Sequence, residues 1–216
     1  MFLSGFLFLF ILVLNIIMAT FGYKMEKEDY NPDADLQKIN NNPKKFKNGI
    51  MLALIEHGSV IALTMLLFIA FSSYNLALGI VWLIFRTGEG LIQFINEPNY
   101  WRLLNIARKY SNSKGPEKNS LSNLARTIFN KKDNRFKFAM ICWSVGTSSF
   151  SIVLVTSGIV PEIIGWLGIV SSILVGSTTG MKLAKPNSKD YTAMGGLSAI
   201  LFEIIIGILL IYYSII

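Results

Sequence analysis

The sequence has a single cysteine, a single histidine and little charge. One cysteine, Cys142, cannot form an internal disulfide, and one histidine, His57, is too few for a zinc site of the usual ligand count. Charged residues make up 15% of the 216 residues, whereas a soluble domain carries about 25%. Apolar residues make up 52%, and the mean hydropathy is +0.50. These features exclude a soluble enzyme, a disulfide-built secreted module and a disordered chain, and they indicate an integral membrane protein.

Apolar runs long enough to cross a membrane recur along the chain. A transmembrane helix needs about 20 predominantly apolar residues, and such runs are too long for the strands of a membrane barrel. We therefore predict an all-α integral membrane bundle of six transmembrane helices, one domain over residues 1–216. The predicted spans are residues 2–22, 50–71, 75–95, 136–157, 162–182 and 193–216. The first is predicted to be a retained span rather than a signal peptide, because it lacks a basic start and a small-residue cleavage site.

Positive charge gathers on one side of the predicted bundle. The connections 72–74 and 158–161 permit only tight turns, whereas 23–49, 96–135 and 183–192 are longer loops. These loops and their adjoining residues hold 19 of the 20 Lys and Arg residues and nine acids, a net charge of +10. The positive-inside rule places the three loops in the cytoplasm and both termini outside, in a multi-pass protein of the cell membrane. The basic face is expected to meet anionic lipid headgroups, and no nucleic-acid partner is expected, since no basic-aromatic module is visible.

Short helices are predicted inside the longer loops. Over about 120–131, apolar residues recur at helical spacing behind Ser120, a candidate N-cap. This amphipathic cytoplasmic-loop helix is expected to pack on the underside of the bundle, although its pattern also suits a helix that lies on the headgroups or docks a partner. Residues 100–107 are interpreted as an interfacial continuation of the third span. Asp33 and Asp35 form an Asp-x-Asp pattern without the Gly and distal Glu of a calcium loop, so a capped turn and a short helix are expected.

Small residues form stripes on the last two predicted spans. Helices in lipid associate through small residues that let their backbones approach closely. Residues four apart share a helix face, so we expect each stripe to form a groove and these two helices to pack on each other. The stripes are Gly168, Ser172, Gly176 and Gly180 in the fifth span, and Gly195, Ala199 and Gly207 in the sixth, where Glu203 takes the intervening position.

A cluster of polar and ionisable residues is predicted inside the spans. Its members are Asn15, Glu56, His57, Arg86, Glu89 and Glu203. A charged side chain in the hydrocarbon costs several kcal/mol unless it is partnered. At about 1.5 Å per residue, Asn15 and the four charged members lie roughly 9–15 Å below the cytoplasmic boundary, in one layer. Arg86 and Glu89 are three residues apart on one helix face and are predicted to pair.

Three interpretations of this polar layer stay open from the residues alone. They are a network that fixes helix register, a proton or solute pathway that opens toward the cytoplasm, and a catalytic site. No nucleophile–base pair, phosphate loop or metal-ligand spacing supports catalysis, so no enzyme, cofactor or metal is expected. The sequence favours a structural or accessory membrane protein, working alone or with other membrane subunits. The alternative is a small transporter or proton-coupled carrier that uses Glu56, Arg86, Glu89 and Glu203.

The order of several motifs resembles a known family. These motifs are Asp33-Ala34-Asp35, an acid early in the second span, Arg86 in the third, Ser157-Gly158-Ile159-Val160-Pro161 leading into Ile164-Gly165-Trp166-Leu167-Gly168, and Ile200-Leu201-Phe202-Glu203. Over nearly the whole chain, the sequence is similar to the bacterial and archaeal six-span membrane family called domain of unknown function 4386. The resemblance implies six helices and no established activity. It also implies that Glu56, Arg86, Pro161, Gly165 and Glu203 occupy family-like positions.

Overall fold

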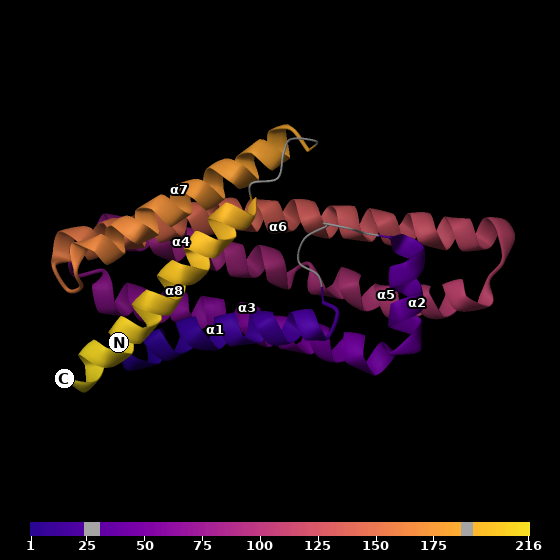
Figure 1. Ribbon diagram of the computed structural model, residues 1–216, viewed down its shortest axis with the longest axis horizontal. Helices are drawn as coiled ribbons and strands as arrows, with labels where there is room; N and C mark the ends of the chain where they lie inside the picture. Colours follow the sequence, from indigo (N-terminus) through magenta and orange to yellow (C-terminus); the bar gives the residue numbers. More distant parts are fainter. Residues whose placement is uncertain (24–30, 187–191) are drawn as a thin grey trace.

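The computed structural model describes residues 1–23, 31–186 and 192–216, and these residues form eight helices and no strand (Figure 1). The helices are α1 (Phe2–Thr20), α2 (Pro32–Asn41), α3 (Pro43–Phe71), α4 (Leu76–Phe94), α5 (Glu97–Asn112), α6 (Gly115–Ser157), α7 (Glu162–Ala184) and α8 (Thr192–Ile215). The predicted all-α fold is confirmed.

Six of these helices are long and apolar enough to cross a membrane: α1, α3, α4, α6, α7 and α8. Each one overlaps one predicted span. Their outer faces carry exposed apolar side chains, among them Ile69, Ile84 and Ile173. An apolar surface of this extent is unfavourable in water and suits lipid tails. The chain is therefore a multi-pass membrane bundle.

Two tight hairpins pair the spanning helices as predicted. Asn75 caps α4 by accepting a hydrogen bond from the backbone N–H of Leu78 at 3.1 Å. Gly158 ends α6 with a φ of +68°, a left-handed conformation that favours glycine, and lets the chain reverse into α7. Both turns lie at the same end of the molecule as the two chain termini (Figure 1).

The helix predicted over about 120–131 exists, but it is not a separate surface helix. It is part of α6, which runs unbroken for 43 residues from Gly115 to Ser157. Residues 131–135 contain neither Pro nor Gly, so nothing in the sequence stops the helix between the loop and the fourth span. At about 1.5 Å per residue α6 is roughly 65 Å long, about twice the hydrocarbon thickness. Its first half therefore projects beyond the membrane.

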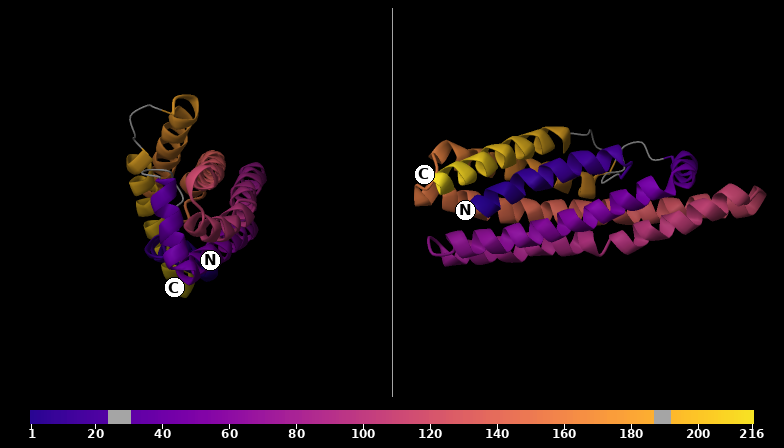
Figure 2. Two further views of the ribbon diagram at one scale, coloured as in Figure 1. Left: turned by 90° about the vertical axis from the view of Figure 1, so that its right-hand side faces the viewer. Right: turned by 90° about the horizontal axis from the view of Figure 1, so that it is seen from below.

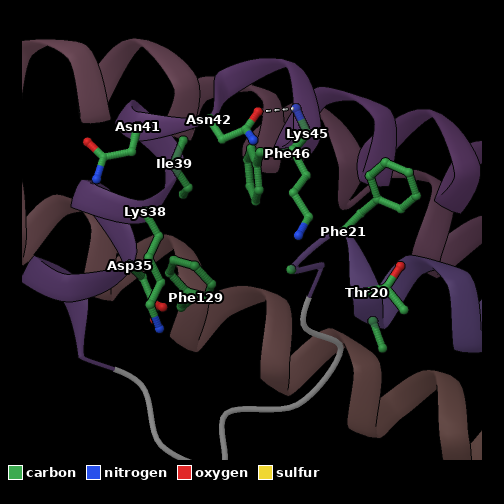
Figure 3. Close-up of a pocket in the computed structure, with 12 residues that line it drawn as sticks. Thr20, Phe21, Asp35, Lys38, Ile39, Asn41, Asn42, Lys45, Phe46 and Phe129 are labelled. Carbon is green, nitrogen blue, oxygen red and sulfur yellow. Dashed lines mark hydrogen bonds between the residues drawn. The ribbon is translucent and has the colours of Figure 1, made fainter.

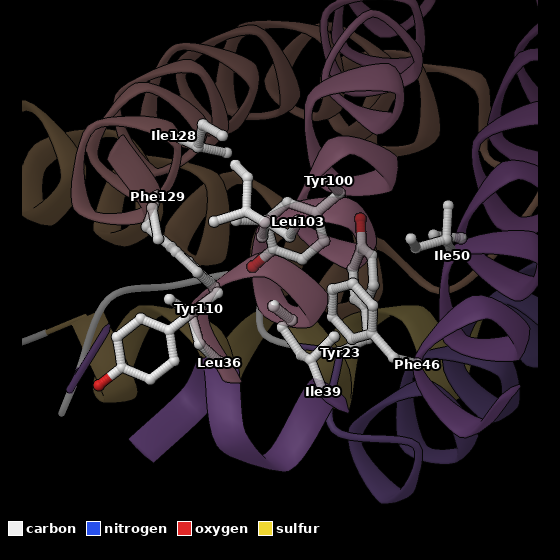
Figure 4. Packing of buried hydrophobic residues seen from close by; sticks show 14 of the residues in the cluster. Tyr23, Leu36, Ile39, Phe46, Ile50, Tyr100, Leu103, Tyr110, Ile128 and Phe129 are labelled. Atoms are coloured by element: carbon white, nitrogen blue, oxygen red, sulfur yellow. The ribbon is translucent and has the colours of Figure 1, made fainter. Parts of the chain in front are cut away.

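The projecting part of the molecule is built from α2, α5, residues 43–49 of α3 and residues 115–135 of α6; we call it the basic end. These helices enclose a hydrophobic core of their own (Figure 4). The core includes Tyr23, Leu36, Ile39, Phe46, Ile50, Tyr100, Leu103, Tyr110, Ile128 and Phe129. The apolar side of residues 120–131 is thus buried against protein, as expected for packing under the bundle and not for a helix that lies on the headgroups.

The predicted capped turn and short helix at the Asp-x-Asp pattern are confirmed as the start of α2. The Asn31 side chain accepts hydrogen bonds from the backbone N–H groups of Asp33 at 3.1 Å and Ala34 at 3.2 Å. Hydrogen bonds from Ser122 and Tyr110 lower the pKa of the Asp33 carboxyl group. Asp33 therefore ties α2 to both α5 and α6.

The small-residue stripe of α7 packs mainly on α6. Ser144 of α6 donates a hydrogen bond from Oγ to the carbonyl oxygen of Ser172 at 2.6 Å. A Cβ atom added to Gly176 would lie 3.1 Å from the Cβ of Ser144. Gly168 faces a phenyl ring of α8, whereas Gly180 has no neighbouring atom within 4 Å of an added Cβ. The α7–α8 contact expected from the stripes is present, but α6 takes most of the α7 groove.

The stripe of α8 meets two different helices. Gly195 backs onto α7, where an added Cβ would lie 3.1 Å from the Cα of Val175. Gly207 backs onto α1, where an added Cβ would lie 3.2 Å from the carbonyl oxygen of Gly5. Ala199 lies between them and lines a cavity. As α8 runs from the basic end toward the termini it thus passes from α7 to α1, and the right-hand view of Figure 2 shows α8 beside α1.

Candidate functional site

A cavity of about 810 Å³ lies among the six spanning helices. Every spanning helix contributes to its lining. The polar lining residues are Asn15, Glu56, Arg86, Glu89, Gln93, Trp143, Thr178, Thr179, Thr192 and Glu203. Between α1 and α8 the lining is apolar and includes exposed side chains such as Ile16 and Ile200. One part of the lining is therefore polar and the part between α1 and α8 is apolar. We call the part formed by Glu56, Arg86, Glu89 and Glu203 the polar floor and the part between α1 and α8 the apolar flank.

Arg86 and Glu89 form the ion pair expected from their spacing. Arg86 Nη1 lies 2.5 Å from Glu89 Oε2, and each residue is 3% exposed. The Arg86 guanidinium also lies over two indole rings, 5.3 Å from the Trp82 centroid and 5.9 Å from the Trp143 centroid. A Cβ atom added to Gly146 would lie 2.7 Å from Arg86 Cγ, so this glycine makes room for the arginine stem where α4 meets α6.

Glu203 brings the last helix into the site. Trp143 of α6 donates a hydrogen bond from its indole N–H to Glu203 Oε1 at 3.1 Å. Glu203 is partly buried and faces the cavity. No described Lys, Arg or His nitrogen lies within ion-pair distance of this carboxyl group. Among the described residues, the hydrogen-bond donor to Glu203 is thus a neutral group.

Glu56 connects the cavity to a second buried group of titratable residues. It lines the cavity and forms a hydrogen bond with Nδ1 of the adjacent His57. The other imidazole nitrogen, Nε2, lies 3.4 Å from Glu97 Oε1 at the start of α5. All three residues are buried. A continuous chain of contacts therefore leads from the cavity floor toward the basic end.

Beyond Glu97, the chain of contacts reaches a lysine held by two aromatic rings. Lys132 Nζ lies 3.4 Å from the Tyr100 ring centroid, 3.5 Å from the Tyr23 centroid and 4.0 Å from Glu97 Oε1. The Tyr23 hydroxyl donates a hydrogen bond to Glu97 Oε1. Burial, together with the neighbouring charge of Glu97, raises the pKa of the Tyr23 hydroxyl well above its ordinary value. The hydroxyl therefore stays a donor to this carboxylate.

Five of the six predicted cluster residues line the one cavity. They are Asn15, Glu56, Arg86, Glu89 and Glu203, whereas His57 lies behind the floor between two carboxyl groups. Two buried polar atoms in the lining, Asn15 Oδ1 and Arg86 Nε, have no hydrogen-bond partner in the described part of the chain. Two of the residues that line the cavity thus each have a buried polar atom, one acceptor and one donor, whose hydrogen-bonding capacity is unsatisfied among the described residues.

A second, smaller pocket of about 390 Å³ lies at the basic end (Figure 3). It is lined by the end of α1, by α2, by the first turns of α3 and by Phe129 of α6. Its charged lining residues are Asp35, Lys38 and Lys45. None of the predicted cluster residues reaches this pocket, so the larger cavity is the candidate site.

One family comparison matches the chain. A family model described as domain of unknown function (DUF4386) matches residues 3–213. The chain belongs to this family. No curated protein and no solved structure matches it. Because the DUF4386 description assigns no activity, what this family member does has to be argued from its cavity.

Three residues of this DUF4386 chain's site escaped prediction. Glu97, Lys132 and Tyr23 lie outside the predicted spans, where charged and phenolic groups are ordinarily solvated. Lys132 is only 5% exposed, although it lies in a loop rich in basic residues. The sequence does contain an indication that Lys132 is buried. It follows Phe129 by three residues and precedes Phe136 by four, which puts it on the apolar face of the helix. The burial of Glu97 had no such signal.

Proposed function

We propose that this DUF4386 protein is a small proton-coupled carrier whose solute occupies the cavity among the spanning helices. The observation that carries the proposal is the convergence of three carboxyl groups and one guanidinium from three helices on a single cavity of about 810 Å³. Ligand cavities in proteins have volumes of about 300–1,000 Å³ and few, convergent polar groups. Carboxyl groups inside a membrane mark ion and proton pathways when they face such a cavity.

A network that only fixes helix register fits these observations less well. Such a network is packed to native density and satisfies its own hydrogen bonds. Here Arg86 Nε and Asn15 Oδ1 have no partner among the described residues, although both belong to residues that line the cavity. Unsatisfied hydrogen-bonding groups on residues that line a cavity are typical of a site that receives a ligand.

The contacts behind the cavity supply a route for protons. Glu56, His57 and Glu97 succeed one another without an intervening apolar residue, and imidazole exchanges a proton through either ring nitrogen. We propose that this relay links the cavity to the basic end. Under the positive-inside rule the basic end is cytoplasmic, where its exposed cations meet anionic headgroups.

Reconstituted vesicles test the carrier. The purified protein is placed in vesicles that contain a trapped pH-sensitive dye, and amines, lipophilic cations, amino acids and organic acids are added one at a time outside. We expect one class to change the internal pH with the parent protein, and Glu203→Gln to abolish that change while helical content is kept. The matched control is Glu162→Gln, the same change at an exposed residue of α7. A Glu203→Gln variant that moves protons like the parent contradicts the proposal.

An accessory role is the second candidate, and the basic end is the observation that favours it. This part has its own core and projects beyond the spans. Its surface carries exposed cations on α3 and α5, including Lys44, Arg102 and Arg108. We propose this surface as the docking platform if the protein serves a larger membrane complex. In native membranes, the size of the complex should then fall when these three residues are replaced by Ser and stay unchanged for Glu162→Gln.

A further inference from the structure

The carboxyl groups that line the cavity outnumber the cationic side chains that pair with them. Arg86 is held by Glu89 at 2.5 Å, and Glu56 is hydrogen-bonded to His57. Glu203 has a neutral partner, the indole N–H of Trp143 at 3.1 Å. Among the described residues, the cavity therefore contains one carboxyl group without a cation of its own.

We propose, building on the carrier function, that the solute of this cavity is a hydrophobic organic cation, which binds at Glu203 in exchange for the proton that this carboxyl group holds when the site is empty. Charge is conserved in the exchange. One cation enters, one proton leaves the Glu203 carboxyl oxygen for water or a neighbouring base, and no covalent bond to carbon is made or broken. Such an exchange avoids an uncompensated charge in a low-dielectric site.

The flank of the cavity fits the apolar body of such a cation. Between α1 and α8 the cavity is lined by aliphatic side chains, which are Leu9, Leu12, Val13, Ile16, Ile200 and Ile204. The Trp143 indole, which also lines the cavity, holds the Glu203 carboxyl group through its N–H. A positive charge gains from a carboxylate, and an apolar body gains from aliphatic walls.

The same surroundings disfavour an anion. Glu203 is faced by Arg86 and Glu89 from α4, by Glu56 from α3 and by the uncharged Trp143 from α6, while α1 and α7 contribute only Asn15, Thr178 and Thr179 as polar lining. An anion would meet three carboxyl groups and one guanidinium whose nearest carboxylate is 2.5 Å away. A sugar would leave its hydroxyl groups facing aliphatic walls.

Calorimetry of the detergent-solubilised protein tests the exchange with two probes of equal shape and opposite charge. Tetraphenylphosphonium should bind and release about one proton, seen as a dependence of the binding enthalpy on the buffer, and its affinity should weaken about tenfold per pH unit on the acid side. Glu203→Gln should lower the phosphonium affinity by about tenfold or more and remove the pH dependence. Glu203→Asp should keep both, and Glu162→Gln should match the parent.

Tetraphenylborate, the anion of the same shape, is the negative control and should bind more weakly than the phosphonium. Equal binding of the borate and the phosphonium, or phosphonium binding that is insensitive to Glu203→Gln, overturns the proposal. If Glu203→Gln does not fold, the test is made on the parent protein. A carbodiimide that modifies protonated buried carboxyl groups should label Glu203, and bound phosphonium should protect Glu203 from this labelling. Labelling that the phosphonium does not affect also overturns the proposal.

The two proposals fail in distinguishable ways. If the carrier function holds but the solute is not a cation, another solute class moves protons in the vesicles while the phosphonium does not bind. If the phosphonium binds with release of a proton but no solute moves protons across the vesicle membrane, the binding site is correct and the carrier function is wrong.

Discussion

At the scale of single residues, Arg86 is the cationic side chain of the cavity lining, and it makes contacts with several neighbours. It pairs with Glu89, its guanidinium lies over two indole rings, and its stem occupies space that Gly146 leaves free. These contacts join α4 to α6 and set the direction of the guanidinium. Removing Arg86 therefore affects both the charge of the site and the packing of two spans.

Arg86→Ala is expected to lower the free energy of unfolding in detergent by about 3–5 kcal/mol, because it leaves the buried Glu89 carboxyl group without its cation. The double variant Arg86→Met/Glu89→Leu removes both charges at similar volume and should recover most of the loss. Arg102→Ala, at an exposed arginine, is the control and should stay within about 0.5 kcal/mol of the parent. Equal losses in the single and double variants would show that the ion pair is not the source.

The tyrosine behind the cavity makes a second prediction at this scale. Tyr23→Phe removes the hydroxyl group that donates to Glu97 and should destabilise the protein by about 1.5–3 kcal/mol, since hydrogen bonds to charged groups are the stronger ones. Tyr74→Phe, at an exposed tyrosine in the α3–α4 turn, should change little. A double-mutant cycle with Glu97→Gln measures the coupling directly. Additive effects would mean that the two side chains do not stabilise each other.

At the scale of helices, α6 connects the two halves of the molecule. Its second half packs on α4 and α7 within the membrane, and its first half packs on α2 and α5. Because the helix is unbroken, it runs from the basic end to Trp143, which donates a hydrogen bond to Glu203. The α6–α7 contact is therefore the place where packing of the spans can be tested most directly.

Two glycines of α7 give a matched pair for that test. Gly176→Ala should destabilise the protein by about 1–2 kcal/mol, because the new Cβ displaces Ser144, whose hydroxyl group bonds the Ser172 carbonyl oxygen. Gly180→Ala meets no neighbouring atom and should be neutral or stabilising by up to about 1 kcal/mol, since Ala is the better helix former. Thermal unfolding in detergent measures both, and a Gly176→Ala variant as stable as Gly180→Ala would contradict the α6–α7 assignment.

The sequence was informative wherever one helix alone determines the outcome. Run length located the six spans, and three-residue spacing paired Arg86 with Glu89. It was less informative where distant segments meet. Whether Lys132 lies on a solvated or a buried face depends on α2 and α5, which pack against α6 in the fold. Likewise, the α7 stripe could not reveal that Ser144 of α6, rather than α8, would occupy it.

At the scale of the whole molecule, the buried apolar side chains form two hydrophobic cores. One lies among the spans and includes Phe150, Leu154 and Phe202, and the other lies in the basic end. Between them lie the cavity floor and the Glu56–His57–Glu97 contacts. The molecule thus has one apolar end that carries both termini and one cation-rich end, and its orientation decides from which side the relay is reached.

We predict the orientation from charge, and introduced cysteines can measure it. With 19 of 20 Lys and Arg residues in or beside the longer loops, the positive-inside rule predicts that the basic end lies in the cytoplasm. In a Cys142→Ser background, Ser73→Cys in the α3–α4 turn should react with a membrane-impermeant maleimide in intact cells. Ser120→Cys, equally exposed near the start of α6, should react only after permeabilisation. The Cys142→Ser protein alone gives the background, and the reversed labelling pattern would place the basic end outside and the relay on the opposite side of the membrane.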